Sequence, residues 1–130
     1  MCNINKMDNQ KTILIVEDEK AIQGAFKKGF ESYGYNVMTA DNGKEGLELI
    51  ESIGPDLVIL DILMPEMNGE EVLEAMHKKG LTENIPVLVV SNKSDGVSLF
   101  KCKKLGAKEY LIKVNVTLDE LHEKVKQYLS

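Results

Sequence analysis

The chain has 130 residues, of which 43% are hydrophobic and 28% charged, and its formal net charge is −5. This length suits a single globular domain. The negative charge argues against a nucleic-acid-binding domain, because phosphate contacts need a basic surface. No stretch reaches the roughly twenty apolar residues that cross a bilayer, and residues 1–10 lack the apolar core of a secretory signal. We therefore expect a cytoplasmic protein that binds neither nucleic acid nor membrane.

Residues 1–11 are polar, and we expect them to form a flexible N-terminal leader, because short polar termini rarely pack. The predicted domain, residues 12–130, begins with an apolar strand over 12–16 that ends at the acidic run 17–19. The helix that follows has apolar residues at helical spacing, namely Ile22, Ala25, Phe26, Gly29 and Phe30. A second strand over 35–40 is less apolar and therefore belongs at a sheet edge.

The same strand and helix pattern repeats along the rest of the chain. Asp41-Asn42-Gly43 predicts a turn, and the helix after it ends at Gly54-Pro55. The remaining strands are predicted over 56–60, 86–90 and 108–112, and the remaining helices over 67–78, 95–105 and 117–128. Thr117 and Glu120 have the spacing of a capping box, which opens the last helix.

Five strands in strict alternation with helices predict a doubly wound α/β domain, a parallel five-stranded sheet with helices on both faces. The carboxyl ends of parallel strands meet at one edge of the sheet, where ligands bind. The polar residues at these ends are Glu17 and Asp18 after the first strand, Asp61 after the third, Ser91 after the fourth and Lys113 after the fifth. We therefore expect three carboxylates, a hydroxyl and an ammonium to converge in one crevice.

This set of groups favours phosphoryl transfer onto Asp61. Clustered carboxylates raise one another's pKa, and a hard divalent cation such as Mg²⁺ or Mn²⁺ relieves the repulsion through oxygen ligands. An ammonium and a hydroxyl can contact an anionic oxygen, and phosphoryl transfer depends mainly on positioning and charge neutralisation. Each residue alone has an ordinary explanation: the acidic run 17–19 suits a helix start, Ser91 a turn, and Lys113 a solvated edge. Asp61, between a buried strand and a proline-bounded loop, has none.

The chain resembles a response-regulator receiver domain, the phosphoacceptor module of two-component signalling, over about residues 11–129. The matching segments are 13–19, 57–69, 86–91 and 106–113. The second of them, LVILDILMPEMNG, is highly specific for that family. The resemblance implies a flavodoxin-like fold with strand order 2-1-3-4-5. It also implies a phosphoprotein that is not an enzyme, beyond catalysing its own phosphorylation and dephosphorylation.

By this resemblance, each residue at the sheet edge receives a role. Asp61 would accept a phosphoryl group from a histidine kinase or a histidine phosphotransfer protein. Mg²⁺ would be held by Glu17, Asp18, Asp61 and the backbone carbonyl of Leu63, Lys113 would contact the phosphoryl oxygen, and Ser91 and Tyr110 would form the switch. The output would pass to an effector protein through the surface around the fourth helix, the fifth strand and the fifth helix. The oligomeric state would be a monomer or a phosphorylation-dependent dimer.

Several positions depart from the family pattern. Ser91 stands where threonine is commoner, Asn92 where a small residue is usual, and Val114 where proline is typical. A non-proline cis peptide bond costs about 3 kcal/mol, so we expect the loop after Lys113 to take another path. The residue two positions after Asp61 is the apolar Leu63, which cannot position an attacking water, and we expect slow self-dephosphorylation.

Three alternatives stay open. A Mg²⁺-dependent aspartyl-phosphate hydrolase would need an acidic residue at the position of Leu63. A flavodoxin-like cofactor binder would need a phosphate-cradling loop after the first strand, where the acidic run 17–19 would repel an anion. The chain could also be a receiver cut from a larger regulator rather than a stand-alone one. We prefer the stand-alone receiver.

Overall fold

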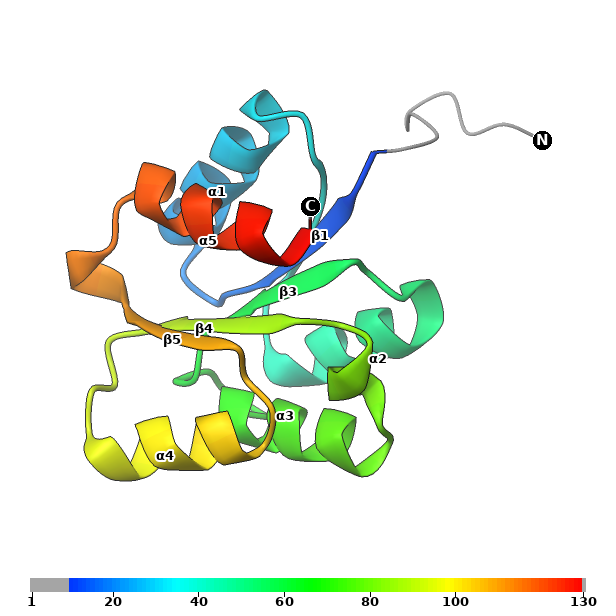
Figure 1. The fold of residues 1–130 in the computed structure, drawn as a ribbon, viewed down its shortest axis with the longest axis vertical. Helices are drawn as coiled ribbons and strands as arrows, with labels where there is room; N and C mark the ends of the chain where they lie inside the picture. The colour runs from blue at the N-terminus through cyan, green and yellow to red at the C-terminus, as the bar shows by residue number, and fades with distance from the viewer. Residues whose placement is uncertain (1–9, 130) are drawn as a thin grey trace.

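The computed structural model describes residues 10–129, which form a five-stranded sheet with helices on both faces (Figure 1). The sheet order is β2-β1-β3-β4-β5 and every neighbouring pair is parallel. The strands are β1 (Thr12–Val16), β2 (Asn36–Ala40), β3 (Leu57–Leu60), β4 (Val87–Ser91) and β5 (Glu109–Ile112). The helices are α1 (Lys20–Ser32), α2 (Gly43–Ile53), α3 (Gly69–Lys78), α4 (Gly96–Lys104) and α5 (Leu118–Leu129), with short 3-10 turns η1 (Leu81–Glu83) and η2 (Lys113–Asn115). The predicted fold class and strand order are confirmed.

Two apolar cores flank the sheet. Helices α1 and α5 cover one face, and α2, α3 and α4 cover the other (Figure 1). Successive side chains of a strand point to opposite faces, so Ile13 and Ile15 pack under α1 and α5 whereas Leu14 and Val16 join the other core. Strands covered on both faces have continuous apolar sequences, and every residue of β1, β3 and β4 is buried. Strand β2 is only partly buried and lies at the edge, as its composition predicts.

The predicted element boundaries agree with the structure to within two residues. The capping box at the last helix is confirmed, because the Glu120 amide donates to Thr117 Oγ1 and the Thr117 amide donates to Glu120 Oε1. The predicted inner face of α1 needs one correction. Ala25 is exposed to solvent, and the polar Gln23 is buried on the inner face instead. The inner face of the first turn of α1 lies over the carbonyl groups at the end of the sheet, where a hydrogen-bond donor fits better than a methyl group.

Most of the predicted leader, residues 1–9, lies outside the described residues, and the boundary at residue 12 stays a prediction. At its described end, the Lys11 carbonyl accepts a hydrogen bond from the Asn36 amide, next to the first β1–β2 pair. In the described part of the chain, no helix combines the length and the apolarity needed to cross a bilayer.

A tight loop joins β3 to α3 and fixes the position of Asp61. The Gly69 amide donates to the Ile62 carbonyl over 2.9 Å, so the loop folds back on the residues that follow β3. A side chain at Gly69 would not fit, because its Cβ would lie 2.2 Å from the Asp61 carbonyl oxygen. Asn68 and Glu71 form a capping box at the start of α3, which satisfies the first free amides of that helix.

Candidate functional site

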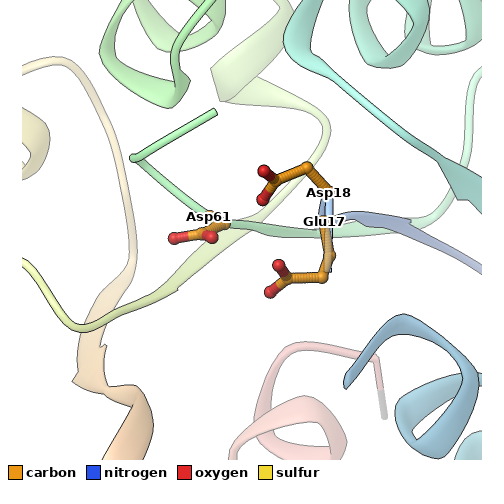
Figure 2. Close-up of side chains that lie close together, drawn as sticks. All are labelled: Glu17, Asp18 and Asp61. Carbon is orange, nitrogen blue, oxygen red and sulfur yellow. The ribbon is translucent and has the colours of Figure 1, made fainter. Parts of the chain in front are cut away.

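Three acidic side chains gather at the carboxyl ends of β1 and β3. The parallel register pairs Val16 with Leu60, which places Glu17 and Asp18 beside Asp61. One oxygen from each of the three carboxylates lies within 4.8 Å of the others, and Figure 2 shows the three groups side by side. Glu17 and Asp61 are only 2% and 5% exposed, whereas Asp18 is half-buried. The three acids that the sequence predicts at this edge therefore do meet.

Lys113 bridges two of these carboxylates. It lies at the start of η2, directly after β5, and its side chain is 8% exposed. Its Nζ atom is 2.7 Å from Glu17 Oε1 and 3.0 Å from Asp61 Oδ2. Burial alone would lower the pKa of Lys113, but the hydrogen bonds to Glu17 and Asp61 outweigh it and raise the pKa. The lysine is thus charged and held against the acids at neutral pH.

The remaining oxygens of the buried carboxylates bind backbone amides. The Ile62 amide donates to Asp61 Oδ1 over 2.7 Å, and the Glu19 amide donates to Glu17 Oε2 over 3.0 Å. Burial raises the pKa of Glu17, and the Asp61 charge adds to this, although the hydrogen bonds from Lys113 and Glu19 oppose it. Lys113 contacts Glu17 and Asp61 but supplies only one positive charge for three carboxylates. An all-oxygen donor set with excess negative charge fits a hard cation such as Mg²⁺ or Mn²⁺.

The two predicted switch residues are linked through Lys93. Ser91 ends β4, is fully buried, and its Oγ accepts a hydrogen bond from the Lys93 amide over 3.2 Å. Tyr110 in β5 is also buried, and its hydroxyl donates to the Lys93 carbonyl. Burial raises the pKa of Tyr110 to about 12, so its hydroxyl keeps its proton at neutral pH. Lys93 Nζ in turn lies 3.7 Å from Glu70 in α3.

Two of the positions that depart from the family pattern contact each other. Asn92 is exposed, and its Oδ1 accepts a hydrogen bond from the Val114 amide over 3.1 Å. A proline at 114 has no N–H and could not make this contact. The bond between Lys113 and Val114 is trans, since none of the described residues has a cis peptide bond, and the chain there forms the turn η2. Leu63, two residues after Asp61, is 58% exposed.

One residue near the site was missed by sequence reasoning. Gln23 on α1 is buried, and its side-chain amide donates to the Glu17 carbonyl over 2.9 Å, at the base of the acidic pair. Its spacing from Phe26 and Phe30 was the available signal, because positions i, i+3 and i+7 share one helix face. A polar residue on an otherwise apolar face needs a hydrogen-bond partner.

Comparison with known families gives a clear match over most of the chain. The family model of the response regulator receiver domain matches residues 13–126. Sporulation initiation phosphotransferase F from Bacillus subtilis is 36% identical over 123 residues, covering 95% of this chain and 96% of that protein. Regulator of RpoS from Escherichia coli is 38% identical over 115 residues, but the match covers 88% of this chain and only 34% of that protein. The chain therefore spans about a third of the length of that relative.

Solved structures agree with these sequence matches. A CheY-like response regulator receiver domain protein from Methanospirillum hungatei superposes with a TM-score of 0.86, at 34% identity, covering 92% of this chain and 94% of that one. The response regulator TrrA from Thermotoga maritima, solved in complex with Mg²⁺ and BeF, gives a TM-score of 0.80 at 37% identity, covering 92% of this chain and 99% of that one. Both superpositions cover 92% of this chain and show the same five-stranded parallel fold.

Proposed function

The chain belongs to the response regulator receiver domain family of two-component signalling, and from this premise we propose that Asp61 is its phosphoacceptor. One observation carries the proposal. The Asp61 carboxylate lies at the end of β3, next to Glu17 and Asp18, which can bind one cation together with it. The Lys113 ammonium lies 3.0 Å from Asp61 Oδ2. This arrangement supplies a nucleophilic oxygen and the positive charge that a transferred phosphoryl group requires.

The transfer would exchange one bond for another. An Asp61 oxygen bonds to phosphorus while the bond between phosphorus and the imidazole nitrogen of a phosphohistidine breaks, and that nitrogen keeps the electron pair. Lys113 then contacts a phosphoryl oxygen in place of the Asp61 oxygen that it holds in this structure. The Ser91 hydroxyl donates to another phosphoryl oxygen.

Receiver domains bind Mg²⁺ at an acidic site, and Glu17, Asp18 and Asp61 form an acidic cluster here. These three carboxylates, with the backbone carbonyl of Leu63, would hold the ion. A cation held there, Mg²⁺ or Mn²⁺, would supply positive charge to the phosphoryl oxygens. The protein residues position the acceptor oxygen, and their repulsion when no cation is bound favours binding of one.

The switch would begin at Ser91. Its hydroxyl now accepts from the Lys93 amide, and a turn toward a phosphoryl group on Asp61 would release this contact. Tyr110 holds the same Lys93 through the carbonyl, so movement of one residue changes the surroundings of the other. Local hydrogen bonds that bias two loop positions are a common basis for switching. Tyr110 is already buried here, so its part in the switch would be to keep or release the contact with Lys93 when Ser91 moves.

Receiver domains interact with histidine kinases or histidine phosphotransfer proteins, and the kinase of this chain would be of that class. We propose a cytoplasmic protein that is not an enzyme on other substrates, and that is a monomer or a phosphorylation-dependent dimer. The effector would bind the surface around α4, β5 and α5. Val97 and Phe100 on α4 and Val114 on η2 are exposed there, and exposed apolar groups mark interaction surfaces.

Labelling of the full chain by acetyl phosphate with Mg²⁺, followed by peptide mapping, tests the assignment. We expect one phosphoryl group on the peptide that contains Asp61, no label without a divalent cation, and no label on Asp61→Ala. An Asp95→Ala variant is a suitable control, because Asp95 is an exposed acid that caps α4 and is not one of the three clustered carboxylates. Label on Asp61→Ala at wild-type level would overturn the proposal.

A further inference from the structure

Gln23 on α1 links the carboxyl ends of β1 and β2, next to the backbone of Glu17 and Asp18. The residue is 7% exposed, and its Nε2 atom lies 2.9 Å from the Glu17 carbonyl, 3.2 Å from the Ala40 carbonyl and 2.9 Å from Asp41 Oδ1. All three partners are oxygen acceptors, so the nitrogen of the amide must face them. One buried side chain therefore connects α1 to the carboxyl ends of both β1 and β2.

Backbone hydrogen bonds and the ion pair between Lys113 and Glu17 also hold the acidic run 17–19. The Glu17 amide donates to the Ala40 carbonyl over 3.1 Å, and the Gln23 amide donates to the Glu19 carbonyl over 2.9 Å. Asp41, which accepts from Gln23, also accepts from Lys20 Nζ over 2.6 Å. The hydrogen bond from Gln23, followed by that from Lys20, lowers the pKa of Asp41, so Asp41 stays an ionised acceptor near neutral pH.

Electrostatic repulsion acts against this connection. Glu17 and Asp18 face Asp61 within 4.8 Å, and like charges at that separation favour an outward movement of the acidic segment. Lys113 offsets part of this repulsion through its contacts with Glu17 and Asp61. Strand β1 ends at Val16, and beyond it the Glu17 amide keeps a backbone hydrogen bond to the sheet at the Ala40 carbonyl. Gln23 holds the Glu17 carbonyl in place.

We propose that Gln23 is a positioning residue for the divalent cation, because it fixes the backbone that carries Glu17 and Asp18 at the distance from Asp61 at which all three can bind one ion. This inference rests on the proposed function. Groups that hold metal ligands in place affect metal affinity by about 10-fold to 100-fold when they are removed. Gln23 contacts the backbone of a ligand rather than its carboxylate, so the lower end of this range applies.

The test compares divalent-cation affinity in the full chain by isothermal titration calorimetry with MgCl₂ and MnCl₂. Gln23→Leu keeps the size of the side chain but removes its donors, and we expect its Kd to rise about 10-fold. Gln127→Leu is the matched control, because Gln127 is an exposed glutamine on α5; its Kd should equal that of the wild type. Circular dichroism confirms that each variant is folded under the titration conditions.

A purely structural role would lower stability in metal-free buffer but leave the Kd of the folded molecules unchanged, and a folded Gln23→Leu with wild-type Kd overturns the inference. If Gln23→Leu does not fold, Gln23→Asn decides in the same way, because its amide is one methylene too short to reach the Glu17 carbonyl. Asp61→Asn separates the two proposals. If Asp61→Asn binds the cation with the Kd of the wild type, the proposed metal site is refuted. If Asp61→Asn binds more weakly but the Gln23 variants keep the wild-type Kd, only the positioning role of Gln23 is refuted.

Discussion

Replacing Lys113 with methionine tests the charge balance of the site most directly. Methionine has nearly the length of lysine but no charge, so the cavity stays filled while the ammonium disappears. Glu17 and Asp61, both buried, would lose the group that lies 2.7 Å and 3.0 Å from them. Two carboxylates would then face each other and Asp18 in a poorly solvated site.

Removing one partner of a buried ion pair costs about 3–5 kcal/mol, because the other charge is left uncompensated. The backbone amides of Ile62 and Glu19 still bind one oxygen of each acid, and Glu17 can take up a proton, so we expect the lower end, about 3 kcal/mol at pH 7 in EDTA. Lys20→Met is the matched control. Lys20 lies 2.6 Å from Asp41, but these side chains are 71% and 46% exposed, and exposed pairs contribute about 0–1 kcal/mol.

The stability that Lys113→Met loses relative to the wild type should be larger at pH 7 than at pH 5. Burial already raises the pKa of Glu17, and Lys113 opposes that shift, so the variant should raise the pKa further. When the pKa of a group is higher in the folded than in the unfolded state, the folded protein binds more protons than the unfolded chain at pH values between the two pKa values. The stability of Lys113→Met should therefore fall as pH rises through that window, and its deficit relative to the wild type should narrow from pH 7 toward pH 5.

Urea unfolding followed by far-UV circular dichroism measures these differences, and added MgCl₂ should restore part of the loss, because the ion supplies positive charge. The reasoning about the site would be refuted if Lys113→Met lost no more stability than Lys20→Met at pH 7.

Three further changes examine other parts of the site. Leu63→Asn should shorten the phosphorylated lifetime, because an amide can hydrogen-bond an attacking water and orient it. Decay of the label measures this lifetime, and an unchanged lifetime would exclude Leu63 as its determinant. Between pH 10 and 12 Tyr110 ionises in the unfolded chain but not in the folded protein, where its pKa is about 12. The free energy of unfolding of the wild type should therefore fall with pH about 1.4 kcal/mol per pH unit more steeply than that of Tyr110→Phe. The same pH dependence of urea unfolding in both proteins would contradict this. Gly69→Ala should lower the free energy of unfolding by about 1–3 kcal/mol, because the added Cβ would collide with the Asp61 carbonyl. Gly24→Ala on α1, where a Cβ meets open space, is the control and should stabilise the protein by about 1 kcal/mol. Equal effects of the two variants on urea unfolding would refute the close approach of Gly69 to the Asp61 carbonyl.

The sheet and the meeting of the acids were predictable because each depends on a rule that the chain follows locally. The apolar runs of β1, β3 and β4 are continuous, which requires burial on both faces. Once the strands are parallel, their carboxyl ends must share an edge, and Asp61 follows β3 directly. Lys113 could be placed in the same way, because it follows β5.

Contacts made by single side chains across loops were not predictable. The bond from the Val114 amide to Asn92 joins residues 22 positions apart, and it depends on the path of η2, which no periodicity encodes. Lys113 Nζ lies 2.7 Å from the buried Glu17 and 3.7 Å from the exposed Glu19, and this difference depends on burial at the strand end. The inner face of α1 was predicted from apolar spacing alone, so the polar Gln23 was overlooked and the exposed Ala25 was assigned to that face.

The restraints around the site are unequal, and this inequality explains how a local charge could change the surface. Glu17 and Asp61 are buried at the ends of paired strands, and the Asp61 amide donates to the Val16 carbonyl over 3.0 Å. The segment 91–93, by contrast, is held beyond β4 by side-chain contacts from Tyr110, Glu70 and the Asn92 amide group. A single hydrogen bond of this kind contributes only about 0.5–1.5 kcal/mol. A phosphoryl group on Asp61 would therefore leave the strand ends in place and shift segment 91–93, which leads directly into α4.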